Sequence, residues 1–189
     1  MHIGIDYGSK LAGTTVVSFE QNKYLHFHQS DKKKDADGFL EKWIVERQPD
    51  AIFMDAPLSL PSVYVGEGDD YFYRKCDREV RGMSPMFLGG LTARAMRLKS
   101  KLESPSRPFY EIYPAHLIRV IFPDFKEKKT VSSLPVFLEI LEPVLPISLF
   151  ESPKNWHQVD SILAWYSGWR KKKNLGISFG DSEEGLIWV

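Results

Sequence analysis

Residues 3–8 of the chain read IGIDYG, a short apolar run that ends in an acid and a glycine-containing turn. This pattern predicts a strand over residues 3–7. Two further segments, 14–19 and 23–28, are rich in β-branched residues or alternate in polarity, and only short turns separate the three. Because antiparallel neighbours need only short connections, we expect the three strands to form an antiparallel meander.

The rest of the chain alternates helical patterns with short apolar runs, which is typical of an α/β domain. Residues 51–54 (AIFM) form a continuous apolar run, as expected of a strand buried on both faces. We expect one domain over residues 1–189, with a loop and helical insertion at about 56–105. The other expected elements are helices at 35–47, from Ser84 onward, 115–122, 134–141 and 152–173, and strands at 109–113 and 186–188.

Composition excludes several classes of protein. The 189 residues carry 25 Lys and Arg against 25 Asp and Glu, so the chain does not coat nucleic acid by bulk charge. One cysteine, Cys76, cannot form a disulfide framework or a cysteine-based zinc site, which suits a reducing cytoplasm. No apolar run approaches the roughly 20 residues that span a bilayer. We therefore expect a soluble, cytoplasmic protein without a membrane partner.

Two acids follow two of the expected strands. Asp6 closes the first strand, and Asp55 comes directly after the apolar run 51–54. Ligands of open α/β sheets bind at the carboxyl ends of the strands, so neighbouring strands would bring both carboxylates to one edge. Each acid alone could simply cap a turn. Together they suggest a bound cation, because close carboxylates repel, and oxygen donors without cysteine favour Mg²⁺ or Mn²⁺.

The last long helix supplies a third acid. Asp160 lies off the apolar stripe of this helix, on a face shared with His157, Ala164 and Gly168 at steps of three and four. Small residues on that face would let the helix approach a sheet closely while it presents an acid. A solvated Asp160 and a surface His157 are the alternatives.

This set of residues resembles a known superfamily. The run IGIDYG (3–8), the acid after a buried strand at Asp55, and HQVD (157–160) in a late helix resemble the RNase H-like superfamily. The His-x-x-Asp helix is most similar to its RuvC-type resolvase branch. The chain departs from that branch at Asp55, where RuvC-type resolvases generally carry Glu.

Three longer motifs resemble a narrower group. DAPLSLP (55–61), RKCDREVR (74–81) and GDSEEG (180–185) are similar to a widespread family of uncharacterised predicted nucleases on the RNase H fold. The motifs span nearly the whole chain. The resemblance implies a mixed sheet of five strands, the first three antiparallel, flanked by helices.

The resemblance also implies an activity. Asp6, Asp55 and Asp160 would hold two Mg²⁺ or Mn²⁺ ions about 4 Å apart for phosphodiester hydrolysis. His157 would shuttle a proton or orient water. The partner would be nucleic acid, either DNA or RNA, and the two-fold symmetry of resolvase substrates suggests a homodimer.

An arginine ridge is a candidate for substrate binding. Arg74, Arg78 and Arg81 would share one face if their segment is helical, and such ridges contact phosphates. Asp77 and Glu79 are interleaved with them, so an internal salt-bridge network explains the pattern as well.

Glu111 is a candidate fourth metal ligand. It lies in the expected strand 109–113, whose neighbouring residues are largely aromatic or apolar. In a half-buried strand, the side chain of Glu111 would point either toward the sheet edge that carries Asp6 and Asp55 or toward solvent.

Two other functions remain open. Asp6-Tyr7-Gly8 followed by Thr14-Thr15 also resembles the phosphate-binding hairpin of actin-like ATPases, although those enzymes close two such domains over a nucleotide and this chain holds about one. ATP binding would favour that phosphotransferase. Alternatively, the chain is a non-catalytic binding or scaffold protein, which a failure to bind Mg²⁺ or Mn²⁺ would favour.

Overall fold

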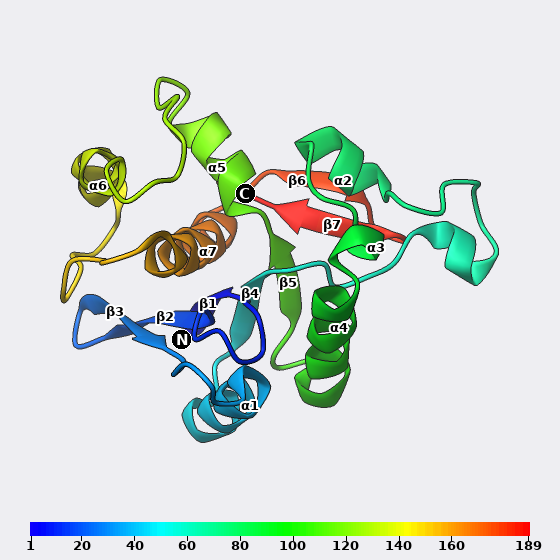
Figure 1. Cartoon of the computed structure of the whole chain (residues 1–189), viewed down its shortest axis with the longest axis horizontal. Helices are drawn as coiled ribbons and strands as arrows, with labels where there is room; N and C mark the ends of the chain where they lie inside the picture. Colours follow the sequence, from blue (N-terminus) through cyan, green and yellow to red (C-terminus); the bar gives the residue numbers. More distant parts are fainter.

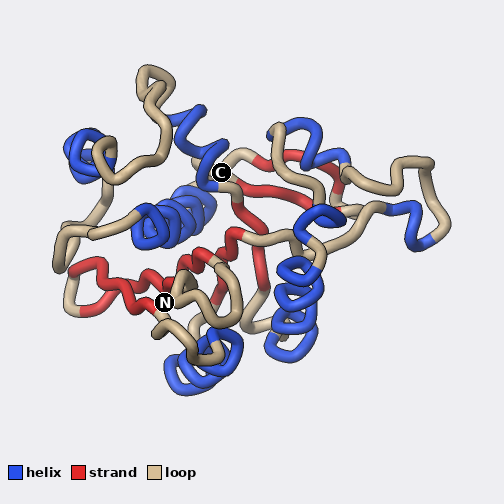
Figure 2. The backbone as a smooth tube through the Cα atoms, viewed as in Figure 1, coloured by secondary structure: helices blue, strands red, loops and turns tan.

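The computed structural model describes residues 1–189, and its centre is one mixed sheet with strand order β3-β2-β1-β4-β5-β7-β6 (Figures 1 and 2). The strands are β1 His2–Asp6, β2 Val16–Gln21, β3 Tyr24–Gln29, β4 Ala51–Asp55, β5 Phe109–Ile112, β6 Ser178–Asp181 and β7 Gly185–Trp188. Strands β1 to β3 are antiparallel neighbours, and β1, β4, β5 and β7 run parallel. The expected α/β class and the antiparallel first three strands are confirmed.

The expectation of five strands is wrong, because the C-terminal segment adds a hairpin. Strands β6 and β7 pair antiparallel, and β7 lies beside β5. Gly180 and Gly185 flank the hairpin turn at φ 101° and 146°, values that side chains other than glycine rarely adopt. The GDSEEG motif is therefore the connection that extends the sheet to seven strands.

Helices cover both faces of the sheet (Figure 1). The α-helices are α1 Ala36–Arg47, α2 Lys75–Val80, α3 Pro85–Leu88, α4 Gly90–Leu102, α5 Pro114–Ile121, α6 Leu134–Leu141 and α7 Trp156–Lys172, with short 3₁₀ turns at Ser62–Val65 and Glu142–Val144. Helices α1 and α4 pack on one face, and α7 with α5 and α6 packs on the other. No helix is both long enough and apolar enough to cross a membrane.

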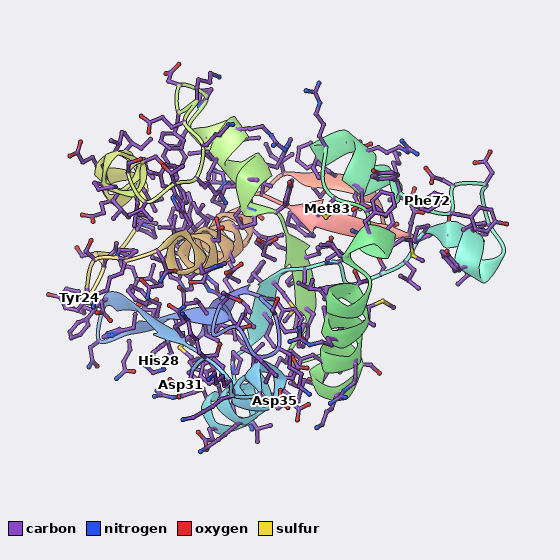
Figure 3. All side chains as sticks on the ribbon, viewed as in Figure 1. Tyr24, His28, Asp31, Asp35, Phe72 and Met83 are labelled. Carbon is purple, nitrogen blue, oxygen red and sulfur yellow. The ribbon has the colours of Figure 1, made fainter.

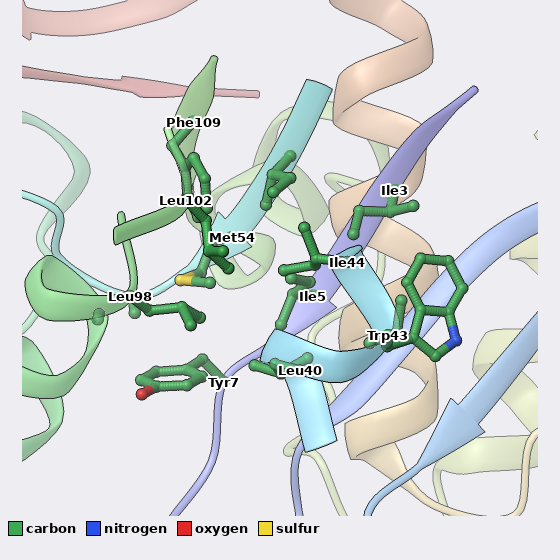
Figure 4. Close-up of a cluster of buried hydrophobic side chains, with 14 of the residues drawn as sticks. Ile3, Ile5, Tyr7, Leu40, Trp43, Ile44, Met54, Leu98, Leu102 and Phe109 are labelled. Atoms are coloured by element: carbon green, nitrogen blue, oxygen red, sulfur yellow. The ribbon is translucent and has the colours of Figure 1, made fainter. Parts of the chain in front are cut away.

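The pleat of β1 divides its side chains between the two layers. Ile3 and Ile5 are fully buried in the core formed with α1 and α4, which Figure 4 shows in close-up. Residues alternate between the faces of a strand, so Gly4 and Asp6 point toward α7. Every residue of β1 is buried.

Two expected helices have different boundaries. The helix expected from Ser84 onward breaks at Gly89, where φ is 47°, and resumes as α4. Phe87, in the short helix before the break, is 63 % exposed. Helix α7 begins at Trp156 rather than near Ser152, because the Asn155 side chain caps it by accepting a hydrogen bond from the backbone N–H of Gln158.

Glycine lets α7 lie unusually close to the sheet. A Cβ at Gly4 would stand 2.0 Å from the backbone nitrogen of Trp165 and 2.4 Å from the carbonyl oxygen of Ser161. A Cβ at Gly168 would stand 2.5 Å from the Phe53 ring. Both glycines are therefore contact points between the helix and the sheet, and they set how close the side chains of α7 come to β1 and β4.

We expect Gly4→Ala to lower the free energy of unfolding by about 3 kcal/mol, because the added methyl group meets backbone atoms that cannot rotate away. Chemical denaturation measures this change. Gly90→Ala is the matched control, since a Cβ there meets nothing within 4 Å. Equal stability of the two variants would contradict the close packing of α7 on β1.

Candidate active site

Asp6 and Asp55 lie opposite one another at the carboxyl ends of two parallel strands. The register pairs Asp6 of β1 with Asp55 of β4, as Ile5 pairs with Met54 before them. Paired residues of neighbouring parallel strands point to the same face, here the face covered by α7. Asp6 and Asp55 therefore lie side by side at one edge of the sheet, which we call the acidic edge.

Helix α7 brings Asp160 and His157 to this edge. The Nδ1 atom of His157 lies 2.8 Å from Oδ2 of Asp6, and Asp160 Oδ1 lies 2.5 Å from Nζ of Lys129. Lys129 comes from the loop between α5 and α6 and also stands over the Trp156 ring. All four residues that the sequence singles out for catalysis, namely Asp6, Asp55, Asp160 and His157, therefore gather at one place.

The three carboxylates are electrostatically strained. Burial, with the charge of Asp160, raises the pKa of Asp6 to about 6, although the hydrogen bond with His157 lowers it. Burial and the charges of Asp6 and Asp160 raise the pKa of Asp55 well above its usual range. Burial also raises the pKa of Asp160 against the lowering effect of Lys129. The hydrogen bond with Asp6 raises the pKa of His157.

This donor set fits a divalent cation. Asp55 accepts no hydrogen bond and has no ion-pair partner, and the two acids beside it bear like charge. Asp55 is half-buried, and a carboxylate removed in part from water needs its charge compensated. In this structure no three Asp, Glu, His or Cys side chains are grouped closely enough to ligate one ion, and His157 and Lys129 contact Asp6 and Asp160. Mg²⁺ or Mn²⁺ would compete with Lys129 for Asp160.

We expect Asp55→Asn to raise the stability of the metal-free protein at pH 8, because the amide removes a charge that burial and the neighbouring acids disfavour. The raised folded-state pKa means that ionised Asp55 destabilises the fold at every pH above its unfolded pKa of about 4. Below about pH 4 the carboxyl is neutral in both states, so the gain should vanish there.

Thermal melting in the presence of a chelator measures this gain. Asp124→Asn serves as the control, because Asp124 is exposed and forms no ion pair. A loss of stability in Asp55→Asn at pH 8, with Asp124→Asn unchanged, would show that Asp55 is not under electrostatic strain.

Glu111 does not join the three aspartates. It pairs in register with Met54 of β4, so its side chain lies on the sheet face opposite that of Asp55. Both of its carboxylate oxygens accept hydrogen bonds from Arg74, at 2.7 and 2.6 Å, and one also accepts from the backbone N–H of Leu58. The hypothesis of Glu111 as a fourth metal ligand is therefore not supported by this geometry.

Arg74 is a structural residue and not a surface contact for substrate. Its side chain is fully buried and forms ion pairs with Asp77 and Glu111, both at 2.6 Å. The internal salt-bridge network, left open by the sequence, is what the structure contains. The expected ridge also fails as a helix face, because α2 spans only Lys75–Val80.

The other two arginines remain at the surface. Arg78 pairs with Asp70 and stacks over the Tyr73 ring. Arg81 ends α2 in a left-handed conformation at φ 51°, is exposed and forms no ion pair. Of the three predicted substrate contacts, Arg81 is the one whose charge is free.

The three family-like motifs meet at the Arg74 network. Ser59 of DAPLSLP accepts a hydrogen bond from Arg74, and Glu184 of GDSEEG accepts from the backbone N–H groups of Ser62 and Lys75. Gly180 donates its N–H to Glu79. These contacts connect the loop that follows Asp55 to α2 and to the terminal hairpin. The motifs therefore fix the position of the loop next to the acidic edge.

Lys129 is a site residue that sequence reasoning missed. It lies in the run KEKK at 126–129, which looks like a solvated loop. The only available signal is the number of lysines in a loop before the last long helix, and that signal does not single out one residue. The contact with Asp160 becomes visible only in three dimensions.

Comparison of the chain with family models, with curated proteins and with solved structures found no match. The site is therefore interpreted from its own geometry and chemistry.

Proposed function

We propose that this protein is an RNase H-like nuclease that hydrolyses phosphodiester bonds of DNA or RNA with two bound Mg²⁺ or Mn²⁺ ions. The observation that carries the proposal is the acidic edge itself. Asp6 and Asp55 lie in register on parallel strands, Asp160 approaches from α7, and Asp55 has no partner for its charge. The mixed sheet with three antiparallel first strands supports the RNase H-like class.

The chain's own residues have distinct roles in this proposal. Asp6, in register with Asp55 and close enough to Asp160 to feel its charge, would contribute to the binding of both ions. Asp55 and Asp160 would each complete the coordination of one ion. Divalent ions at such a site lower the pKa of water and neutralise charge on the scissile phosphate. His157 lies beside Asp6 and is 46 % exposed in its side chain, so it can exchange a proton with solvent.

A cleavage panel tests the proposal. Single-stranded, duplex, hybrid and four-way-junction substrates are incubated with Mg²⁺ or Mn²⁺, with wild-type protein beside Asp6→Asn. We expect wild-type protein to cleave at least one substrate and Asp6→Asn to cleave none. Failure of folded wild-type protein to cleave any of them would favour a non-catalytic binding protein, and cleavage retained by Asp6→Asn would place the active site elsewhere.

A further inference from the structure

A cavity of about 280 Å³ opens directly beside the acidic edge. Asp6 and Asp55 form one end of it, so it continues the proposed active site. Its walls come from the carboxyl ends of β1, β4 and β5 and from the segment between α2 and α4. Pockets for drug-sized ligands run from about 300 to 1,000 Å³, so this cavity suits a single small ring system.

The lining of the cavity selects against anions. Four acidic residues, Asp6, Asp55, Asp77 and Glu111, are among those that line it, and no lysine, arginine or histidine is. Asp77 and Glu111 are already paired with Arg74, which leaves no free cation to receive a phosphate or a carboxylate. The remaining walls are largely aliphatic or aromatic, including Leu91 and Ile112. An uncharged, flat, partly apolar group fits this chemistry.

Two tyrosines, Tyr7 and Tyr113, are among the residues that line the cavity. The Tyr7 ring is only 2 % exposed, its hydroxyl donates a 2.6 Å hydrogen bond to Asp37 and Arg94 stands over the ring at 4.8 Å, so Tyr7 is a fixed part of the wall and not a free stacking surface. Tyr113 lines the cavity from the end of β5. Aromatic side chains are the usual stacking partners of unpaired nucleobases.

The mouth of the cavity carries exposed apolar side chains. Met83 lines the cavity yet is 58 % exposed, and in the same 72–87 segment the exposed Phe72 and Phe87 rings contact each other, with ring centroids 5.6 Å apart. Figure 3 labels Met83 and Phe72 on the side of the molecule formed by α2 and α3. Arg81 precedes the cavity residue Gly82 and is exposed without an ion pair, so it can meet a phosphate outside the cavity.

We propose that this cavity takes one unpaired nucleobase of the substrate, next to the phosphodiester at the acidic edge. The inference rests on the proposed nuclease function and names its substrate class: single-stranded or locally unpaired nucleic acid. A base that is stacked and paired within a duplex cannot enter a cavity in the protein without leaving the helix. Met83, Phe72 and Phe87 then support neighbouring bases, and Arg81 contacts the backbone.

Binding tests the inference without relying on cleavage. A fluorescent single-stranded oligonucleotide, in DNA and in RNA form, and the matching duplexes are titrated with protein in Ca²⁺ by anisotropy. We expect at least tenfold tighter binding of one single strand than of its duplex. Met83→Trp, which fills the mouth of the cavity from an exposed position, should weaken single-strand binding about tenfold. Leu175→Trp, an exposed site beyond the far end of α7, should leave it unchanged.

Leu91→Trp fills the cavity from α4 and is the second variant. Single-strand binding unchanged by both Met83→Trp and Leu91→Trp would overturn the base site, as would absence of binding to any nucleic acid.

A second experiment changes the substrate and leaves the protein unchanged: an abasic nucleotide is placed at successive positions of a strand that the protein cleaves. We expect cleavage to fall at least tenfold when the nucleotide flanking the cut lacks its base. Unchanged cleavage at every position would overturn the base site and leave the nuclease assignment standing.

Discussion

Replacing Arg74 with Met should destabilise the protein by about 3–5 kcal/mol, the cost typical of removing one partner from a buried ion pair. The guanidinium is fully buried and makes five hydrogen bonds to the side chains of Asp77, Glu111 and Ser59. Without it, two carboxylates stay buried with no compensating charge. Burial already raises the pKa of Glu111 against the lowering effect of Arg74.

Urea denaturation at pH 7 measures this loss. Arg78→Met is the matched control, because Arg78 lies in α2, the helix that Arg74 precedes, is 62 % exposed in its side chain and pairs at the surface with Asp70. Surface ion pairs contribute at most about 1 kcal/mol. Adding Glu111→Gln to Arg74→Met should recover part of the loss, since one uncompensated charge is removed. Arg74→Met as mild as Arg78→Met would contradict the buried network.

The same variant has a pH dependence of known sign. In Arg74→Met the Glu111 carboxyl loses the cation that lowers its pKa, so its folded-state pKa rises further above its unfolded value near 4 and its ionisation destabilises the fold above about pH 4. The deficit relative to wild-type protein should therefore be large at pH 8 and should shrink as the pH falls toward 4. If the difference in stability between Arg74→Met and wild-type protein does not change over this pH range, its cause is lost packing and not an uncompensated buried charge.

Asp160→Asn should lower metal-dependent cleavage about a thousandfold. Metal ions supply several kcal/mol of transition-state stabilisation, and each 1.36 kcal/mol is a factor of ten in rate. An amide at position 160 keeps the shape of the side chain but loses the charge that would hold an ion. Because burial raises the pKa of Asp160, the neutral amide should not lower the stability of the fold.

The measurement is a single-turnover rate with Mn²⁺ on a substrate that the wild-type protein cleaves, beside a thermal melt. Asp124→Asn, at an exposed acid remote from any ion pair, should cleave at the wild-type rate. If Asp160→Asn retains a rate within tenfold of wild type while folded, Asp160 is not a metal ligand in this reaction.

Local patterns in the sequence were sufficient for much of the fold. The apolar runs of β1 and β4 and the small residues of α7 predict buried strands and a closely packed helix, and Gly4 against Trp165 shows how close that packing is. The terminal hairpin was missed in part. Strand β6 holds Gly180 and is partly exposed, so its sequence lacks a run of β-branched residues.

Long-range pairing is what the sequence could not supply. From the sequence alone, Arg74 is one member of a ridge of arginines expected at the surface. Its partner Glu111 is 37 positions away, and only the folded structure shows their contact. Asp77, three residues after Arg74, was the available local sign of an ion pair. Both orientations of Glu111 stay open in the sequence, because the sequence does not give the face of β5 on which it lies; the register with Met54 does.

Calorimetric titration with Mn²⁺ measures directly whether the acidic edge binds a metal ion, and it does not require a known substrate. We expect wild-type protein at pH 8 to show saturable binding, Asp6→Asn to show none, and Asp124→Asn to match wild type. Absence of Mn²⁺ and Mg²⁺ binding by the folded wild-type protein would contradict a metal centre formed by Asp6, Asp55 and Asp160.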